Sequence, residues 1–294
     1  MTPEPVPVRP VRVVKETPLS FLAKSVHFLK RYIRFAFAFR LDLAMTLLGL
    51  LATTTMWAVM AGLVGPAAAP RLSAHGYGDD YFSFLLLGLM VNSYLWIPLR
   101  KLYSALQSQW GSGWLDFMLL TPSSPLSHLF GPQSYDFFMA TVQVSFQLTV
   151  GYIFFGFEAS PTANIPGALL VLILGLLSMV GWGLLAASTF TLLNAKGGGN
   201  PVAWFLTTFT PLLAGVYYPP ELLPGWLRTV SYLLPHTHAM KGIRKALLEG
   251  ATIKTLLPSI TALITLGAII VPLGYLAFKH SIKKGKKDGS ILPW

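Results

Sequence analysis

Residues 215–227 read GVYYPPELLPGWL, a proline-rich and aromatic stretch that lies between two apolar segments. Proline has no backbone donor and ends helices, so the pair Pro219 and Pro220 predicts the end of the preceding helix. Pro224 suits the first turn of a new helix. Pro235 predicts the end of that helix about eleven residues later, after about 16 Å or half a bilayer. A segment this apolar and this short is expected to re-enter the membrane without crossing it.

A second short helix is expected directly afterwards, over residues 237–249, with Gly250 as its C-terminal stop. Helical spacing separates an apolar side from a basic side, formed by Met240, Ile243 and Leu247 and by Lys241, Arg244 and Lys245. The two helices together predict an extracellular re-entrant helical hairpin at residues 219–249. Such a backbone is stable at membrane depth only when it is buried in protein or lines a cavity. A hairpin that rests on the membrane surface is the alternative.

The composition indicates an integral membrane protein. Of the 294 residues, 53% are hydrophobic and 11% are charged, and the mean hydropathy is +0.59, whereas soluble domains carry about 25% charged residues. A helix that crosses about 30 Å of hydrocarbon needs roughly 20 apolar residues. Six segments approach or exceed that length, so we expect an all-α fold with six transmembrane helices in a single transmembrane domain, at residues 43–65, 82–99, 134–156, 166–194, 201–218 and 255–278.

The net charge of +11 is distributed along the chain as a topology signal. Sixteen of the 22 Lys and Arg residues fall on the side of the two termini, which predicts a multi-pass protein of the plasma (inner) membrane with both termini in the cytoplasm. Residues 1–17 are expected to form a flexible tail, residues 18–40 an amphipathic interfacial helix and residues 279–294 a basic tail. The interfacial helix either anchors the chain or transmits motion to the first span. These basic residues are expected to contact membrane lipids and no nucleic acid.

The connection after the second span, residues 100–122, predicts two short cytoplasmic helices separated by a glycine-rich break. Asp116 lies in the first turn of the second helix, where the helix dipole favours a carboxylate. An aromatic-rich helix in this position either lies on the lipid or contacts a partner protein.

Two sets of motifs in this chain resemble permeases of the ABC type-2 exporter family. The first set is similar to the family's Gly-Thr-Leu-Glu and Thr-Pro motifs, with tryptophan and aspartate replacing threonine and glutamate: Gly113, Trp114, Leu115, Asp116, Thr121 and Pro122. The second set is similar to the family's aromatic-proline, Leu-Pro-x-Trp-Leu, Leu-Pro and arginine motifs: Tyr217, Tyr218, Pro219, Pro220, Glu221, Pro224, Trp226, Pro235 and Arg244. With the predicted spans, the resemblance covers nearly the whole chain.

The resemblance implies a role for each set of motifs. The first set would couple the permease to a separate nucleotide-binding ATPase subunit. The second set would form an extracellular lid over the substrate exit. The cargo of such relatives is a drug, a lipid or a lipid-linked glycan such as a polysaccharide or teichoic-acid precursor, and short external loops favour an amphipathic or lipid-like substrate here.

The source of energy follows from what the spans contain. Apart from Asp136 near one end, the predicted spans carry no acidic or basic residue, although ion-coupled transporters need such groups. The sequence has no Walker motif, so the chain is not expected to be an enzyme or to bind a cofactor, and ATP and Mg²⁺ would bind to the partner subunit. A homodimer of the permease is expected, with the pathway at its two-fold interface.

Two other functions stay open at this stage. A membrane-embedded lipid-processing enzyme would need an acid/base set, for which the candidates are His75, Asp79, Asp80, His236 and His238. A passive channel would need a repeated polar face along a span. The two histidines at 236 and 238 could bind a metal, but helix-end capping is favoured and no metal site is predicted. Polar residues inside the spans either pack helices together or line the pathway: Asn92, Gln143 and Gln147.

Overall fold

The computed structural model describes residues 39–111, 133–192 and 201–287, together with Val26, Lys30, Arg31, Ile33 and Arg34. All regular secondary structure within these residues is helical, which confirms the all-α prediction. The helices are α2 (Arg40–Ala74), α3 (Tyr81–Gly111), α6 (Gln133–Phe155), α7 (Ile165–Leu192), α8 (Pro201–Leu213), η1 (Pro220–Leu222), α9 (Gly225–Tyr232), α10 (Pro235–Leu248) and α11 (Ile253–Lys287). The five isolated positions are helical, and the rest of the predicted interfacial helix lies outside the described residues.

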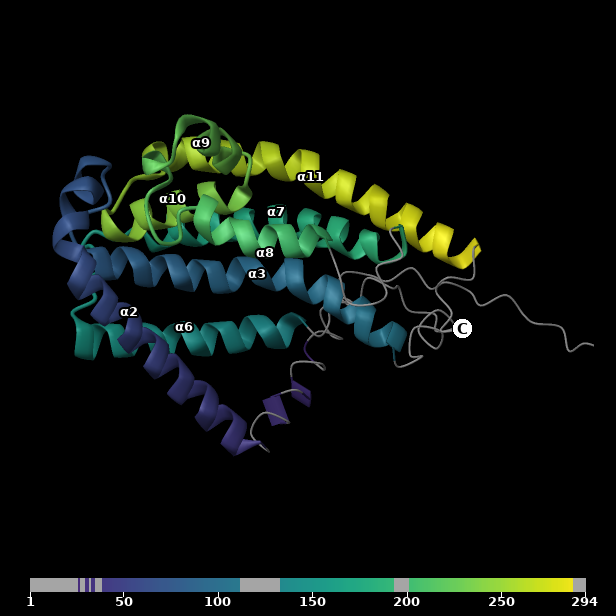
Figure 1. Ribbon diagram of the computed structural model, residues 1–294, viewed down its shortest axis with the longest axis horizontal. Helices are drawn as coiled ribbons and strands as arrows, with labels where there is room; N and C mark the ends of the chain where they lie inside the picture. The colour runs from purple at the N-terminus through teal and green to yellow at the C-terminus, as the bar shows by residue number, and fades with distance from the viewer. Residues whose placement is uncertain are drawn as a thin grey trace, which may run out of the picture.

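The long helices form an elongated bundle in which α3, α6, α7, α8 and α11 run roughly along one axis while α2 crosses them obliquely (Figure 1). We call the end that carries α9 and α10 the hairpin end. We call the opposite end, towards which α3 and α11 run, the basic end, because it carries Arg100, Lys101, Lys279, Lys283 and Lys284.

Five of the described helices are long and apolar enough to cross a membrane: Arg40–Ala74, Tyr81–Ser104, Gln133–Phe155, Ile165–Thr189 and Ile253–Lys284. The chain is therefore a multi-pass membrane protein. The sixth predicted span is helical only over Pro201–Leu213, and 13 residues cover about 20 Å of a hydrocarbon layer of about 30 Å. The six-span topology stays a prediction.

Helix α8 ends earlier than the sequence indicates, because the chain turns before it reaches the proline pair. Gly215 has a φ of 79°, a left-handed conformation that glycine adopts without strain. The turn brings the Gly215 carbonyl to α10 and places this part of the chain beside Phe84 near the start of α3. Helix α8 and its turn thus run antiparallel to α3 over most of the length of that helix.

The core lies between α3, α7, α10 and α11, which bury most of the apolar side chains of the main cluster. Helices α7 and α11 approach closely at two glycines, because a Cβ atom on Gly181 would lie 2.7 Å from the backbone of Ile270 and one on Gly274 would collide with the Gly181 carbonyl. Small residues at such contacts are typical of helix pairs in membranes. In contrast, only 11% of the residues in the 18-residue apolar stretch of α2 are buried. Helix α2 therefore presents apolar side chains to its surroundings.

Candidate transport site at the hairpin and between helices 3 and 8

The predicted hairpin exists as two helices, α9 and α10, but its prolines act differently from the prediction. Pro224 is the N-cap of α9, as expected for a proline at a helix start. Pro235 was predicted to end the first helix of the hairpin. It is instead the first residue of α10, and α9 ends before it at Tyr232. Gly250 has a φ of 66° and follows the C-cap of α10, which confirms its predicted role as the C-terminal stop.

Helix α10 is buried in the bundle, where it packs against α3, α7 and α11. The prediction that Arg244 lies on an outer basic side is wrong, because only 1% of this residue is exposed. Lys241 and Lys245 are only partly buried, as a basic side would require. Three backbone carbonyls that face α10 explain why an arginine can occupy a core position.

Each nitrogen of the Arg244 guanidinium donates a hydrogen bond to a different backbone carbonyl. The Nε atom donates to Phe84 at 3.1 Å, Nη2 donates to Val216 at 2.8 Å, and Nη1 donates to Gly215. The guanidinium also lies over the Phe84 ring, 3.5 Å from its centroid. Burial lowers the pKa of Arg244 to about 9, so the side chain remains charged at neutral pH. Arg244 therefore fastens α10 to the start of α3 and to the turn after α8.

Gly88 makes room for this arginine. A Cβ atom on Gly88 would collide with the Arg244 Nη2 atom and would lie 2.5 Å from the Val216 carbonyl oxygen. A glycine in the middle of a helix normally costs about 1 kcal/mol relative to alanine. Here it allows the guanidinium to pass between α3 and the turn.

A second polar cluster surrounds Glu221 in η1. One carboxylate oxygen of Glu221 lies 2.7 Å from the Lys241 Nζ atom and accepts a hydrogen bond of 3.3 Å from the Tyr77 hydroxyl. Burial alone would raise the pKa of Glu221, but these partners, with Lys241 first, lower it below its usual value. Burial and the neighbouring carboxylate raise the pKa of Tyr77. Glu221 thus links η1 both to α10 and to the loop after α2.

Most of the predicted lid residues gather at the hairpin end. The Tyr217 ring stacks on Trp57 with 5.4 Å between the ring centroids, and its carbonyl accepts a hydrogen bond from the Tyr81 hydroxyl. Pro219, Pro220 and Pro235 are buried and Tyr218 is partly buried. Pro224 and Trp226 are exposed, and 72% of Trp226 is accessible on α9.

The two histidines of the hairpin do different things. His238 Nε2 donates a hydrogen bond of 2.8 Å to the carbonyl of Tyr232, the last residue of α9, which confirms helix-end capping for this residue. His236 is buried against Trp96, with 5.2 Å between the ring centroids, and its Nε2 atom has no hydrogen-bond partner among the residues that the structure describes. Burial lowers the pKa of His236 to about 3. Among the described residues no group of three or more His, Cys, Asp or Glu could hold a metal ion.

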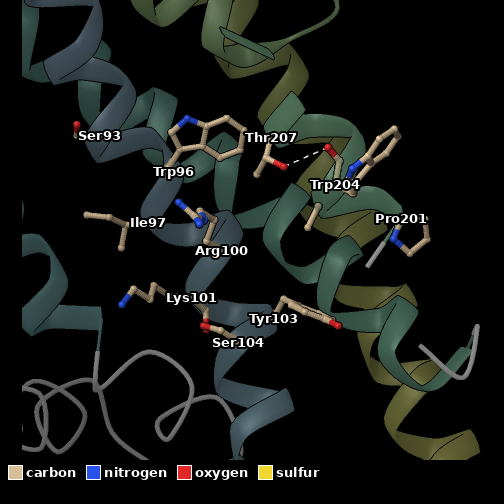
Figure 2. A pocket seen from close by; sticks show the side chains of 11 residues that line it. Ser93, Trp96, Ile97, Arg100, Lys101, Tyr103, Ser104, Pro201, Trp204 and Thr207 are labelled. Carbon is tan, nitrogen blue, oxygen red and sulfur yellow. Dashed lines mark hydrogen bonds between the residues drawn. The ribbon is translucent and has the colours of Figure 1, made fainter. Parts of the chain in front are cut away.

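A cavity of about 890 Å³ lies between α3 and α8, towards the basic end. Its lining combines three tryptophan and tyrosine rings with cations and hydroxyls: Ser93, Trp96, Ile97, Arg100, Lys101, Tyr103, Ser104, Pro201, Ala203, Trp204 and Thr207 (Figure 2). Several of these side chains, such as Arg100 and Trp204, are exposed, so the cavity is open at the surface. Because Trp96 also contacts His236, one aromatic ring joins the cavity to the hairpin.

The predicted pathway residues are only partly brought together. Asn92 lies one helical turn from Trp96 on α3, and within the described part of the chain its buried Oδ1 atom has no hydrogen-bond partner. Gln143 and Gln147 lie on α6, with Gln147 buried, and neither lines the cavity between α3 and α8. The one-turn spacing of Asn92, Trp96 and Arg100 on α3 is a signal in the sequence that could have indicated this cavity.

The predicted coupling residues, from Gly113 to Pro122, lie outside the described residues. Nearby, Lys101 forms an ion pair with Asp136, 2.7 Å between the Nζ and Oδ1 atoms. This pair joins the basic ends of α3 and α6.

The comparisons with known proteins agree with this architecture. No curated protein matches the chain. A family model described as ABC-2 family transporter protein matches residues 70–276, which include the cavity and the hairpin. Permeases of this family are transport components that are not catalytic themselves and generally work with a separate ATP-binding subunit. The chain belongs to the ABC-2 transporter family.

Proposed function

We propose that this chain is the permease subunit of an ATP-driven exporter that moves an amphipathic or lipid-like substrate outward across the plasma membrane. The cavity between α3 and α8 is the observation that carries this proposal. It is large enough for a drug-sized molecule, because ligand pockets measure about 300–1,000 Å³. It combines aromatic walls with polar groups, as an amphipathic cargo requires.

The direction of transport is inferred from the two ends of the bundle. The basic end is cytoplasmic by the distribution of Lys and Arg, with both termini on that side. The cavity opens near this end, and the hairpin closes the opposite end through Arg244 and Glu221. Cargo would enter near the basic end and leave when the hairpin loosens.

The energy would come from a partner subunit that binds ATP and Mg²⁺. Residues 113–122 would contact this subunit, and a second copy of the permease would complete the pathway. The apolar side chains exposed on α2, such as Leu48 and Leu63, support a surface covered by lipid or by that copy.

The observations favour export over the two alternatives. A lipid-processing enzyme would need its acid and base groups to act together, but these candidates make separate local hydrogen bonds. His75 Nδ1 donates to the Arg71 carbonyl, and the Asp80 carboxylate accepts from the backbone N–H groups of Phe82 and Ser83 at the start of α3. In a passive channel, the hydrogen bonds of Arg244 and the ion pair of Glu221 that hold the hairpin would have to break without an energy source. Among cargo types, a lipid-linked glycan is the alternative to a drug or simple lipid.

The test is isolation of the tagged chain from its own membranes, followed by reconstitution in liposomes. We expect an ATPase subunit to copurify in a two-plus-two complex, no ATP hydrolysis by the chain alone, and ATP-dependent movement of members of a panel of fluorescent amphipaths. A partner subunit whose ATPase site is inactivated serves as the control. Movement by the permease without any ATPase would refute the proposal.

A further inference from the structure

The two neighbouring cations of the cavity, Arg100 and Lys101, are in different electrostatic situations. Lys101 is paired with Asp136 at 2.7 Å, so its charge is largely compensated. Arg100 has no hydrogen bond or ion pair with any residue that the structure describes, and its guanidinium extends into the cavity beneath Trp96 (Figure 2). Arg100 therefore contributes an uncompensated positive charge.

The other groups around the cavity strengthen this positive potential. None of the described residues that line it is acidic. Helix α8 begins at Pro201 in the wall of the cavity, so the positive end of its dipole lies there as well. Hydroxyls from α3 and α8, such as those of Ser104 and Thr207, add polar partners within the same space.

The walls on either side of Arg100 are aromatic and apolar. Trp96 and Ile97 come from α3, and Trp204 comes from α8. Trp204 is 63% exposed although it is a large apolar residue, and it packs edge-on against Phe209 with 6.2 Å between the ring centroids. An alkyl chain or flat ring placed along these walls would leave its polar end beside the guanidinium.

We propose that the cavity selects amphipaths with an anionic headgroup, phosphate or carboxylate, which Arg100 binds while Trp96 and Trp204 hold the apolar part. This inference rests on the proposed function, which makes the cavity the cargo site. A guanidinium binds either anion through two parallel hydrogen bonds. A cationic amphipath of the same length would face an uncompensated like charge, so the same residue both attracts one class and excludes the other.

The test uses the permease in phosphatidylcholine nanodiscs, with a Ser93→Cys reporter in the cavity. The chain has no cysteine of its own, so maleimide labelling reports on this position alone. Dodecyl phosphate should slow labelling, whereas dodecyltrimethylammonium at equal concentrations should not. Arg100→Gln should raise the half-effective concentration of dodecyl phosphate about tenfold or more, as expected for the loss of a hydrogen bond to a charged group. Arg100→Lys should retain the preference for the anion.

Arg71→Gln is the matched control, because it removes the same kind of exposed guanidinium charge outside the cavity. It should keep the wild-type response, and a Lys254→Cys reporter at the hairpin end should label at the same rate in every case. Inorganic phosphate should not protect Ser93→Cys, because it has no apolar part. Protection by phosphate as strong as that by dodecyl phosphate would overturn the amphipath assignment.

Nanodiscs with phosphatidylglycerol distinguish the source of the headgroup. Arg100-dependent protection by this lipid alone supports a membrane lipid as the anionic amphipath, and protection by dodecyl phosphate only supports a single-chain molecule from solution. Equal protection by the anionic and cationic detergents, or an unchanged preference in Arg100→Gln, overturns the inference. This assay needs no ATPase, so a charge preference without ATP-driven transport would refute the proposed function alone.

Discussion

At the scale of the residue, Arg244 shows how a charge becomes part of a membrane-protein core. Its three hydrogen bonds reach two carbonyls of the turn after α8 and the carbonyl of Phe84 near the start of α3. A carbonyl oxygen has two lone pairs, so Phe84 can accept this bond in addition to one within its helix. Helical spacing predicted Arg244 on a basic side of its helix. Such spacing gives the direction in which a side chain leaves the helix but not the groups that it contacts. Its acceptors come from residues 28, 29 and 160 positions away, which no local pattern can reveal.

We predict that Arg244→Met destabilises the protein by roughly 3–5 kcal/mol, because it leaves buried carbonyls without a donor. Arg228→Met is the matched control. Arg228 also donates to two carbonyls, those of Glu221 and Leu223, but it is exposed, so water can replace it at a cost of about 0.5–1.5 kcal/mol. Thermal unfolding in detergent, followed by tryptophan fluorescence, measures both. Equal shifts in the two variants would show that Arg244 is not the main anchor.

A second prediction at this scale concerns acid. His236 has a pKa of about 3 in the folded protein because it is buried, against about 6.5 when unfolded. Between these values the unfolded chain binds more protons than the folded one, so the free energy of unfolding falls as the pH falls from about 6.5 towards 3. His236→Phe keeps a ring against Trp96 and removes the titration.

The measurement is the unfolding temperature at pH 7 and pH 5. His236→Phe should lose less stability than the wild type between the two values. His75→Phe, at the C-cap of α2, replaces a histidine outside the core in the same way and is the matched control. If His236→Phe retains the full acid sensitivity, the histidine is not the group responsible.

At the scale of the element, the apolar runs predicted the long helices well, since a helix of about 20 apolar residues leaves no alternative in lipid. Short elements were less predictable. Helix α8 ends at Leu213 although apolar residues continue, because Gly215 and the Arg244 contacts favour a turn there. The cavity was not predicted at all, since it requires the pairing of Arg100 on α3 with Trp204 on α8, and that pairing is set by tertiary packing.

The coupling element predicted within residues 100–122 is tested by Asp116→Arg. We expect the variant to insert normally and to lose the coupling of ATP hydrolysis to transport. Reversing a charge in a first helical turn costs only about 0.3–1 kcal/mol when exposed, which is too little to unfold the protein. Asp42→Arg, in the first turn of α2, suffers the same dipole penalty outside this element and should remain coupled. Full coupling in Asp116→Arg would favour a helix that lies on the lipid.

At the scale of the whole molecule, the two ends of the bundle differ in a way that suits transport. Near the basic end lies an open cavity that contains Arg100, a cation without an ion pair to any described residue. The hairpin end is fastened by Arg244, Glu221 and the stacked pair of Trp57 and Tyr217. These contacts are two polar clusters and one aromatic pair, and α10 adds apolar packing against α3, α7 and α11. A movement confined to η1 and α9 would therefore leave the core intact, whereas a movement of α10 would disrupt it.

The last prediction tests whether the hairpin dips into the outer half of the membrane. Thr229 on α9 and Lys254 at the start of α11 are both exposed on the protein, so the protein itself shields neither position. Thr229→Cys should react slowly with an impermeant maleimide from outside at rest and faster during ATP turnover, while Lys254→Cys should react readily throughout. The exposed Trp226 on α9 and Leu233 at its C-cap are the apolar contacts expected of a helix in lipid. Labelling of Thr229→Cys at the rate of Lys254→Cys at rest would identify an ordinary surface loop, and labelling only from the cytoplasm would reverse the topology.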